Sequence, residues 1–217
     1  MLTLFQRPNL KNLPVYAIRG NHDSYFSWTD ELRLNMEQSQ WQLPTFYYEK
    51  FIPVGDNGEV MGILFVDSVI MLCSDYAAEH LKQHPLTDPE LIRVKQIMCD
   101  DPQWITWGNS QYTWIQETLA VWDQNPYIVW KATIQHYPIF AFHYEQINYQ
   151  QIATIFLPIL QAHKFDLYLN GHEHILGYVQ IPMNPALNEI EEPVVREERQ
   201  LQQEVCTYDV TDWFGNP

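Results

Sequence analysis

Positive charge is scarce in this chain. The 217 residues include 12 Lys and Arg against 27 Asp and Glu, which gives a formal net charge of −15. A field of this sign repels nucleic acid and anionic membrane surfaces, so we expect neither as a partner. An anionic substrate would need a local positive centre in the protein, and a bound metal ion is the simplest one.

Cysteine and long apolar runs are also scarce. Cys73, Cys99 and Cys206 show no Cys-x-x-Cys spacing, which argues against a thiolate metal site and a multi-bridge framework. One disulfide with a spare thiol stays open. No run of about 18 apolar residues occurs, so we expect no membrane-spanning helix. The first residues lack the apolar core and cleavage site of a secretory signal, and the compartment is therefore unknown.

Apolar residues nevertheless make up 46% of the chain and charged residues 18%, which is typical of a globular protein. Strands are predicted at 13–18, 45–51, 59–73, 127–135, 166–170, 176–181 and 205–210. Helices are predicted at 29–41, at 109–122 with a cap at Asn109 or Ser110, and at 149–164 with Pro158 inside. Residues 54–58 form a turn, 77–107 are irregular apart from a short helix near 88–98, and 188–204 form a solvated segment. This order predicts an α/β layered fold.

Histidines follow three of these strands directly. The motif "RGNHD" places Asn21 and His22 after the first strand, "QHYP" places His136 after strand 127–135, and "GHEH" places His172 and His174 after strand 166–170. Ligands of open α/β sheets bind at the carboxyl ends of the strands. Because imidazole and amide oxygen suit a metal with mixed N/O coordination, the pattern indicates a metal cluster.

Taken in this order, GNHD, a single His and GHEH resemble the later motifs of the calcineurin-like metallophosphoesterases. Stretches such as "LPVYAIRGNHD", "ILFVDSVIMLC" and "LYLNGHEHILGY" are similar to the purple, type-5-like (tartrate-resistant) acid phosphatases. The resemblance covers roughly residues 12–181. It implies a β-sandwich flanked by helices that lacks the first β-α segments. We therefore predict a partial catalytic domain at 1–183, followed at 184–217 by an acidic loop and the start of a further strand.

The resemblance also implies roles for the motif residues. Asn21, His136 and His172 would bind a second, divalent metal, and His174 would bind the first metal, usually ferric iron. His22 would hydrogen-bond the phosphate and could protonate the leaving group. The centre would pair iron with zinc, manganese or a second iron, about 3.5–4 Å apart, and a hydroxide would attack a small phosphomonoester or phosphoprotein in line. Proteins of this type are generally exported or lysosomal.

One departure from the family pattern stands out. The family has two carboxylate motifs before GNHD, which supply most first-metal ligands and the bridging carboxylate, whereas no Asp, Glu or His precedes His22 here. We expect the sequence to be the middle and later part of a larger phosphatase. The alternative is a truncated or pseudoenzyme paralogue that binds at most one metal without turnover. A metallo-hydrolase of carboxylic substrates would carry an HxHxDH cluster, and none occurs. The oligomeric state stays open.

Other residues have structural interpretations. Asp23 is predicted to stabilise its turn, Asp56 to be a turn residue, and Asp67 to be a buried structural acid. The Trp-rich segment 104–122 is predicted to lie in the core. We expect solvated, loop or surface positions for Glu173, His80, His84, His143 and His163.

Overall fold

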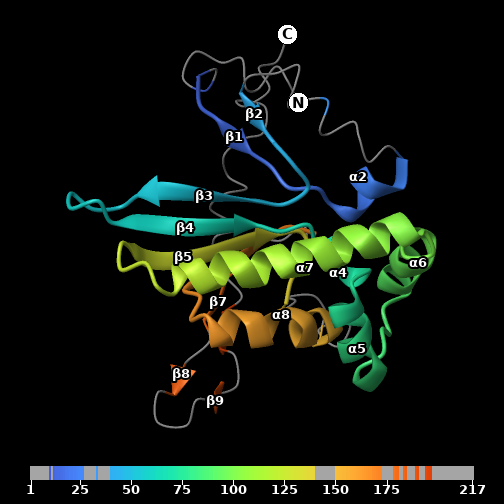
Figure 1. Ribbon diagram of the computed structural model, residues 1–217. Helices are drawn as coiled ribbons and strands as arrows, with labels where there is room; N and C mark the ends of the chain where they lie inside the picture. The colour runs from blue at the N-terminus through green and yellow to red at the C-terminus, as the bar shows by residue number, and fades with distance from the viewer. Residues whose placement is uncertain are drawn as a thin grey trace. The chain divides into compact units, whose positions relative to one another are not determined.

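The computed structural model describes residues 10, 12–26, 33, 40–139, 150–172, 178–180, 183–184, 189–190 and 194–196. The chain divides into two compact units, one made of Met1–Ile139 with Ile147–His172 and the other of Phe140–Gln146 with Glu173–Pro217. The mixture of a sheet with many helices in the first unit confirms the α/β prediction (Figure 1).

A four-stranded mixed sheet forms the centre of the first unit. Its strands lie in the order β3 (Tyr48–Pro53), β4 (Val60–Phe65), β5 (Ile128–Gln135) and β6 (Leu167–Asn170). β3 and β4 are antiparallel, while β4, β5 and β6 are parallel. The register pairs Phe65 with Ile134 and Gln135 with Asn170. The carboxyl ends of the three parallel strands therefore lie side by side.

The predicted turn between β3 and β4 is confirmed. The Val54 amide donates a hydrogen bond to the Glu59 carbonyl oxygen at 3.0 Å, which closes the hairpin. Gly58 has a φ of 85°, a left-handed conformation that favours glycine. Asp56 lies within this turn, as predicted.

Helices follow the strands, and Figure 1 shows them gathered on one side of the sheet. They are α4 (Ser68–Leu72), α5 (Asp75–Gln83), α6 (Pro89–Met98), α7 (Pro102–Trp122) and α8 (Gln150–Ala162). Each of the first four helices begins with an N-cap side chain that accepts hydrogen bonds from backbone N–H groups of the first turn. These N-caps are Asp67, Ser74, Asp88 and Asp101. Proline occupies the first turn of both α6 and α7, where its missing N–H costs nothing.

Two sequence predictions in this region are wrong. The apolar run 59–73 is not one strand, because β4 ends at Phe65 and Asp67 caps a new helix. The segment 77–107 is largely helical rather than irregular, since Pro89 and Pro102 start helices instead of interrupting them. For the same reason the cap of α7 is Asp101, whose carboxylate accepts from the Gln103 amide at 2.8 Å, and not Asn109 or Ser110.

The spacing of Tyr112, Ile115, Leu119 and Trp122 predicts one apolar face on α7. Ile115, Leu119 and Trp122 are buried, which confirms the face there, whereas Tyr112 is half-buried. The Trp122 ring packs closely on Gly62 of β4, because a Cβ added to Gly62 would lie 2.8 Å from Cζ3 of that ring. Farther along the helix, a Cβ on Gly108 would lie 2.7 Å from the Ile70 carbonyl oxygen of α4. These two close approaches seat α7 against both the sheet and α4.

The amino-terminal part contains β1 (Val15–Tyr16), α2 (Asn21–Phe26) and β2 (Trp41–Gln42). β1 and β2 pair in parallel, so the helix predicted at 29–41 is wrong at Trp41. Most of that helix lies outside the described residues. The Tyr48 hydroxyl donates to the carbonyl oxygens of Ala17 and Gln42, at 2.8 and 3.0 Å. This side chain joins the β1–β2 pair to β3.

In the second unit, β7 (Tyr178–Gln180) pairs with β10 (Val194–Arg196), and β8 (Met183–Asn184) pairs with β9 (Glu189–Ile190). The strand predicted at 176–181 therefore forms, with β10 as its partner. The solvated segment predicted at 188–204 is wrong where β9 and β10 occur, and the strand predicted at 205–210 lies outside the described residues. Among the helices that are described, none is long and apolar enough to cross a membrane.

Candidate metal centre

The motif Gly20-Asn21-His22-Asp23 forms the start of helix α2. The Gly20 amide donates to the Asp23 carboxylate at 2.7 Å, and the Ser24 hydroxyl donates to the Gly20 carbonyl oxygen at 3.1 Å. The bond to Asp23 is one half of a capping box, and it confirms Asp23 as a turn-stabilising residue. The two bonds hold the Asn21 side chain in the interior, where it is 1% exposed.

A buried ion pair fixes the residue just before this motif. The Arg19 guanidinium donates to Asp67 Oδ2 through Nε, at 2.8 Å, and through a second nitrogen. Both side chains are fully buried, and the Arg19 guanidinium also lies 3.9 Å from the centre of the Phe46 ring. Asp67 is thus the buried structural acid that the sequence predicts. The pair fastens the GNHD turn to the carboxyl end of β4.

The other two parallel strands, β5 and β6, lead to the two histidines. His136 follows β5, and its carbonyl oxygen accepts a hydrogen bond from the Gly171 amide at 3.2 Å. His172 follows β6 with a φ of 69°, a left-handed conformation that is uncommon for residues other than glycine. The chain therefore turns at His172, and the turn brings its imidazole next to that of His136.

Three side chains from distant segments converge at this edge of the sheet. Asn21 Oδ1 lies 2.6 Å from His136 Nε2, and His172 Nδ1 lies 3.1 Å from the same nitrogen. The amide oxygen can only accept hydrogen bonds, and a neutral imidazole carries one proton for its two nitrogens. The three atoms therefore have more lone pairs than protons between them. Such a group of lone pairs can coordinate one cation.

The composition of the cluster limits what it can hold. In the described part of the chain, no group of three or more His, Cys, Asp or Glu side chains is arranged around a metal position. The cluster consists of two imidazoles and one amide oxygen. Three protein ligands with an open position is a recognised arrangement for a catalytic ion, so these residues fit a single divalent metal.

Glu90 reaches the same cluster from the first turn of α6. Its Oε1 accepts a hydrogen bond from the Asn21 amide nitrogen, and its Oε2 lies 3.8 Å from His172 Nε2. Sequence reasoning did not single out this residue. In "TDPEL" the glutamate has only the signature of an acid at a helix start, and nothing local connects it to Asn21.

The family model described as calcineurin-like phosphoesterase matches residues 2–176. The chain belongs to this family.

The relatives of this phosphoesterase include acid phosphatases. It is 24% identical to tartrate-resistant acid phosphatase type 5 of Sus scrofa, over 82% of this chain and 46% of that protein. It is 36% identical to purple acid phosphatase 4 of Arabidopsis thaliana, over 84% of this chain and 47% of that protein. The chain thus spans about half the length of the curated relatives it matches.

A solved structure has the same fold. It is titled GAP50, the anchor in the inner membrane complex of Plasmodium, and aligns with a TM-score of 0.51 at 15% identity. The alignment covers 77% of this chain and 45% of that one. At this level of identity the likeness concerns the fold alone.

Two further residues were predicted for the site, His22 and His174. His22 is the second residue of α2 and is exposed, beside the buried Asn21. His174, predicted as the first-metal ligand, lies outside the described residues, as do His143 and Glu173. His80 and His163 are half-buried and His84 is exposed. His80 and His84 lie in and at the end of α5, and His163 follows α8, so none of the three belongs to a segment that carries the cluster.

Tyr168 of β6 supports the loop that carries His136. Its hydroxyl donates to the Tyr137 carbonyl oxygen at 2.5 Å. Burial raises the pKa of Tyr168 well above its ordinary value, so the hydroxyl remains a neutral donor at any physiological pH. The Tyr137 ring in turn lies 5.0 Å from the His172 ring, centre to centre. The two histidines therefore rest on packed aromatic side chains.

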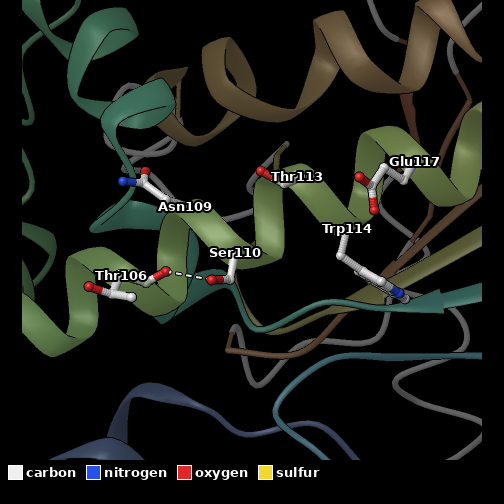
Figure 2. Close-up of a pocket in the computed structure, with 6 residues that line it drawn as sticks. All are labelled: Thr106, Asn109, Ser110, Thr113, Trp114 and Glu117. Atoms are coloured by element: carbon white, nitrogen blue, oxygen red, sulfur yellow. Dashed lines mark hydrogen bonds between the residues drawn. The ribbon is translucent and has the colours of Figure 1, made fainter.

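A separate depression lies along the outer surface of α7 (Figure 2). It measures about 450 Å³ and is lined by Thr106, Asn109, Ser110, Thr113, Trp114 and Glu117. Its polar groups are largely engaged locally, since the Ser110 hydroxyl donates to the Thr106 carbonyl oxygen at 2.8 Å and Asn109 bonds with Asp75. Such a lining offers no converging ligand atoms, and we do not place the site there.

Proposed function

We propose that this chain takes part in the metal-dependent hydrolysis of phosphomonoesters, with Asn21, His136 and His172 holding one divalent ion. The convergence of Asn21 Oδ1, His136 Nε2 and His172 Nδ1 is the observation that supports the proposal. Membership of the calcineurin-like phosphoesterase family supplies the reaction class. A divalent ion held there would act as a Lewis acid on a phosphoryl oxygen and would lower the pKa of a water molecule.

In the related acid phosphatases the centre would hold a second metal ion, and that part of the proposal rests on the family alone. His174 would contribute to the first-metal position, and the metal pair would be iron with zinc, manganese or a second iron. The substrate would be a small phosphomonoester or a phosphoprotein. A bound cation would also counter the formal charge of −15, which otherwise repels a phosphate dianion.

His22 is the proposed proton donor. It follows Asn21 directly, so its backbone is held by the same turn, yet its side chain is exposed where a substrate can reach it. An imidazole ring N–H can donate a hydrogen bond to a phosphoryl oxygen, and an imidazolium can protonate the departing alkoxide or phenoxide. The buried amide and imidazoles would hold the ion, while His22 would act at the rim.

The first prediction separates these roles. Isothermal titration of the chain with Zn²⁺ is expected to give about one ion per chain, since three ligands converge. Asn21→Ala should remove measurable binding. His22→Ala should retain the stoichiometry and lower the turnover of an aryl phosphate by about 10²- to 10⁴-fold, the usual contribution of a positioned acid. His84→Ala removes an exposed histidine by the same substitution and should change neither quantity.

Different outcomes contradict different parts. Tight binding of two ions with rapid turnover would refute the one-ion assignment. Loss of bound Zn²⁺ in His22→Ala would make His22 a ligand. The alternative function is a truncated or pseudoenzyme paralogue that binds at most one metal without turnover. Binding of one ion that depends on Asn21, with no turnover above that of free Zn²⁺, would establish that alternative.

A further inference from the structure

Glu90 contacts two of the three proposed ligands at once. It is the second residue of α6, which Asp88 caps by accepting a hydrogen bond from the Leu91 amide at 2.8 Å. Its carboxylate is only 38% exposed and is directed to Asn21 and His172. An acid at this position would normally remain in solvent, where it would stabilise the positive end of the helix dipole.

The contact with Asn21 decides which end of the amide faces the cluster. A carboxylate can only accept hydrogen bonds, so the amide nitrogen of Asn21 must face Glu90 Oε1. The amide oxygen is then directed to His136 Nε2, at 2.6 Å. Because a metal ion binds the oxygen of an amide and not its nitrogen, Glu90 selects the orientation that can coordinate.

The contact between Glu90 and His172 orients the imidazole ring in a similar way. His172 Nδ1 faces His136, while Nε2 lies 3.8 Å from Glu90 Oε2. A carboxylate on that side favours the tautomer with the proton on Nε2, which leaves the Nδ1 lone pair for an ion. Glu90 also places a negative charge next to three ligands that are all neutral.

We propose that Glu90 is a positioning residue that orients Asn21 and His172 for a divalent ion. The proposal rests on the proposed function above, since it assumes that these residues bind a metal. Both Glu90 oxygens lie on the outer sides of the ligands, next to the amide nitrogen and to Nε2, and not on the side of the coordinating atoms. Glu90 therefore acts through the two ligands.

The second prediction concerns Zn²⁺ affinity. Glu90→Gln should weaken Zn²⁺ binding by about 10- to 100-fold, the usual effect of losing a carboxylate behind a ligand. The glutamine amide can accept through its oxygen but presents an N–H₂ group to the other partner, so it cannot serve both. Glu90→Asp keeps the charge and should restore part of the affinity. The control is Glu79→Gln, which removes the same charge from an exposed pair with Lys82 and should leave affinity within about twofold, as surface pairs contribute little.

A spectroscopic measurement distinguishes positioning from a merely structural role. In metal-free protein at a pH where the imidazoles are neutral, ¹⁵N chemical shifts should show His172 protonated at Nε2 in the wild type. Glu90→Gln should give a mixture of tautomers, with an unchanged melting temperature. An unaltered tautomer together with unaltered Zn²⁺ affinity would overturn the proposal. Loss of a short oxygen scatterer from the Zn²⁺ X-ray absorption spectrum in Glu90→Gln would also overturn it, because Glu90 would then be a ligand.

The two proposals fail in distinguishable ways. If Asn21→Ala abolishes Zn²⁺ binding and Glu90→Gln has no effect, the metal site stands and the positioning role is wrong. If neither substitution changes Zn²⁺ binding, the metal site itself is wrong, and the role of Glu90 falls with it.

Discussion

The imidazole of His136 lies directly against the backbone of Gly20. A Cβ built on Gly20 would lie 2.8 Å from His136 Cε1 and 2.9 Å from Nδ1, closer than non-bonded carbon atoms approach. A Cβ on Gly171, which also lies near this ring, would lie 3.7 Å from Nδ1, an ordinary contact. Neither glycine has a positive φ. The requirement for glycine at position 20 is therefore one of space rather than backbone conformation.

The third prediction follows from this contact. Gly20→Ala should push the His136 ring away from Asn21 and weaken Zn²⁺ binding by about tenfold or more, as misplacement of a ligand does. Gly171→Ala is the matched control and should bind Zn²⁺ as the wild type does. Both affinities can be measured by isothermal titration. Equal effects of the two substitutions would show that the ring has room to adapt.

At the scale of elements, one buried network joins the GNHD turn to β4, α4 and α7. Asp67 pairs with Arg19, and its Oδ1 accepts from the amides of Val69 and Ile70 at 3.0 Å each, which caps α4. Gln111 of α7 completes the network, because it accepts from the Asp67 amide and donates to the Asp67 carbonyl oxygen, each at 2.9 Å. Four segments thus meet at one fully buried residue, Asp67, which bonds to them through its carboxylate and its backbone.

The fourth prediction concerns the stability of this network. Asp67→Asn keeps a side chain that can cap α4 but removes the negative charge that faces the buried positive charge of Arg19, so the free energy of unfolding should fall by about 3–5 kcal/mol. Arg19→Leu combined with Asp67→Asn removes that charge as well. We expect the double variant to be more stable than Asp67→Asn alone in urea unfolding. A double variant that is less stable would show that Arg19 stabilises the fold mainly through its packing on Phe46.

At the scale of the whole molecule, a disulfide adds a covalent constraint to the helical layer. It joins Cys73, the C-cap of α4, to Cys99, the C-cap of α6, across a sequence separation of 26. This pairing resolves what the cysteine count left open, while Cys206 lies outside the described residues. Because Asp67 caps α4 and Glu90 lies in the first turn of α6, the bridge connects the two helices whose amino-terminal residues contact Arg19 and Asn21.

The fifth prediction tests this constraint. Reduction should lower the free energy of unfolding by about 2–4 kcal/mol, since a closed loop of this length restricts the unfolded chain. The change can be followed by denaturant unfolding with and without reductant. A Cys73→Ala/Cys99→Ala variant should match the reduced wild type and should not respond to reductant. If the wild type does not respond either, the bridge contributes nothing to stability.

Several features were predictable because their signals are local. The GNHD turn, the turn at 54–58, strands β5 and β6 and the polar residues at their ends follow from short motifs and runs of β-branched residues. Two further features also had local signals that were misjudged. Asp101-Pro102 marks the start of α7, and Ser74 marks the start of α5, although most of the segment 77–107 was predicted to be irregular.

Other features needed the tertiary structure. Residues 68–72 are buried on all sides, so their periodicity could not separate a helix from a continuation of β4. The contact between Asn21 and Glu90 joins residues 69 positions apart, and it depends on where α6 packs. No pattern within either segment encodes such a contact.

The sequence by itself determined which chemical groups the protein carries, and at which strand ends, because backbone turns and strand propensities act over a few residues. Only the tertiary structure decided which atoms meet. The parallel order of β4, β5 and β6 places His136 and His172 side by side, the Arg19–Asp67 pair holds the GNHD turn next to them, and the packing of α6 adds Glu90. Those contacts depend on burial and charge pairing between distant segments, which exist only once the chain has folded.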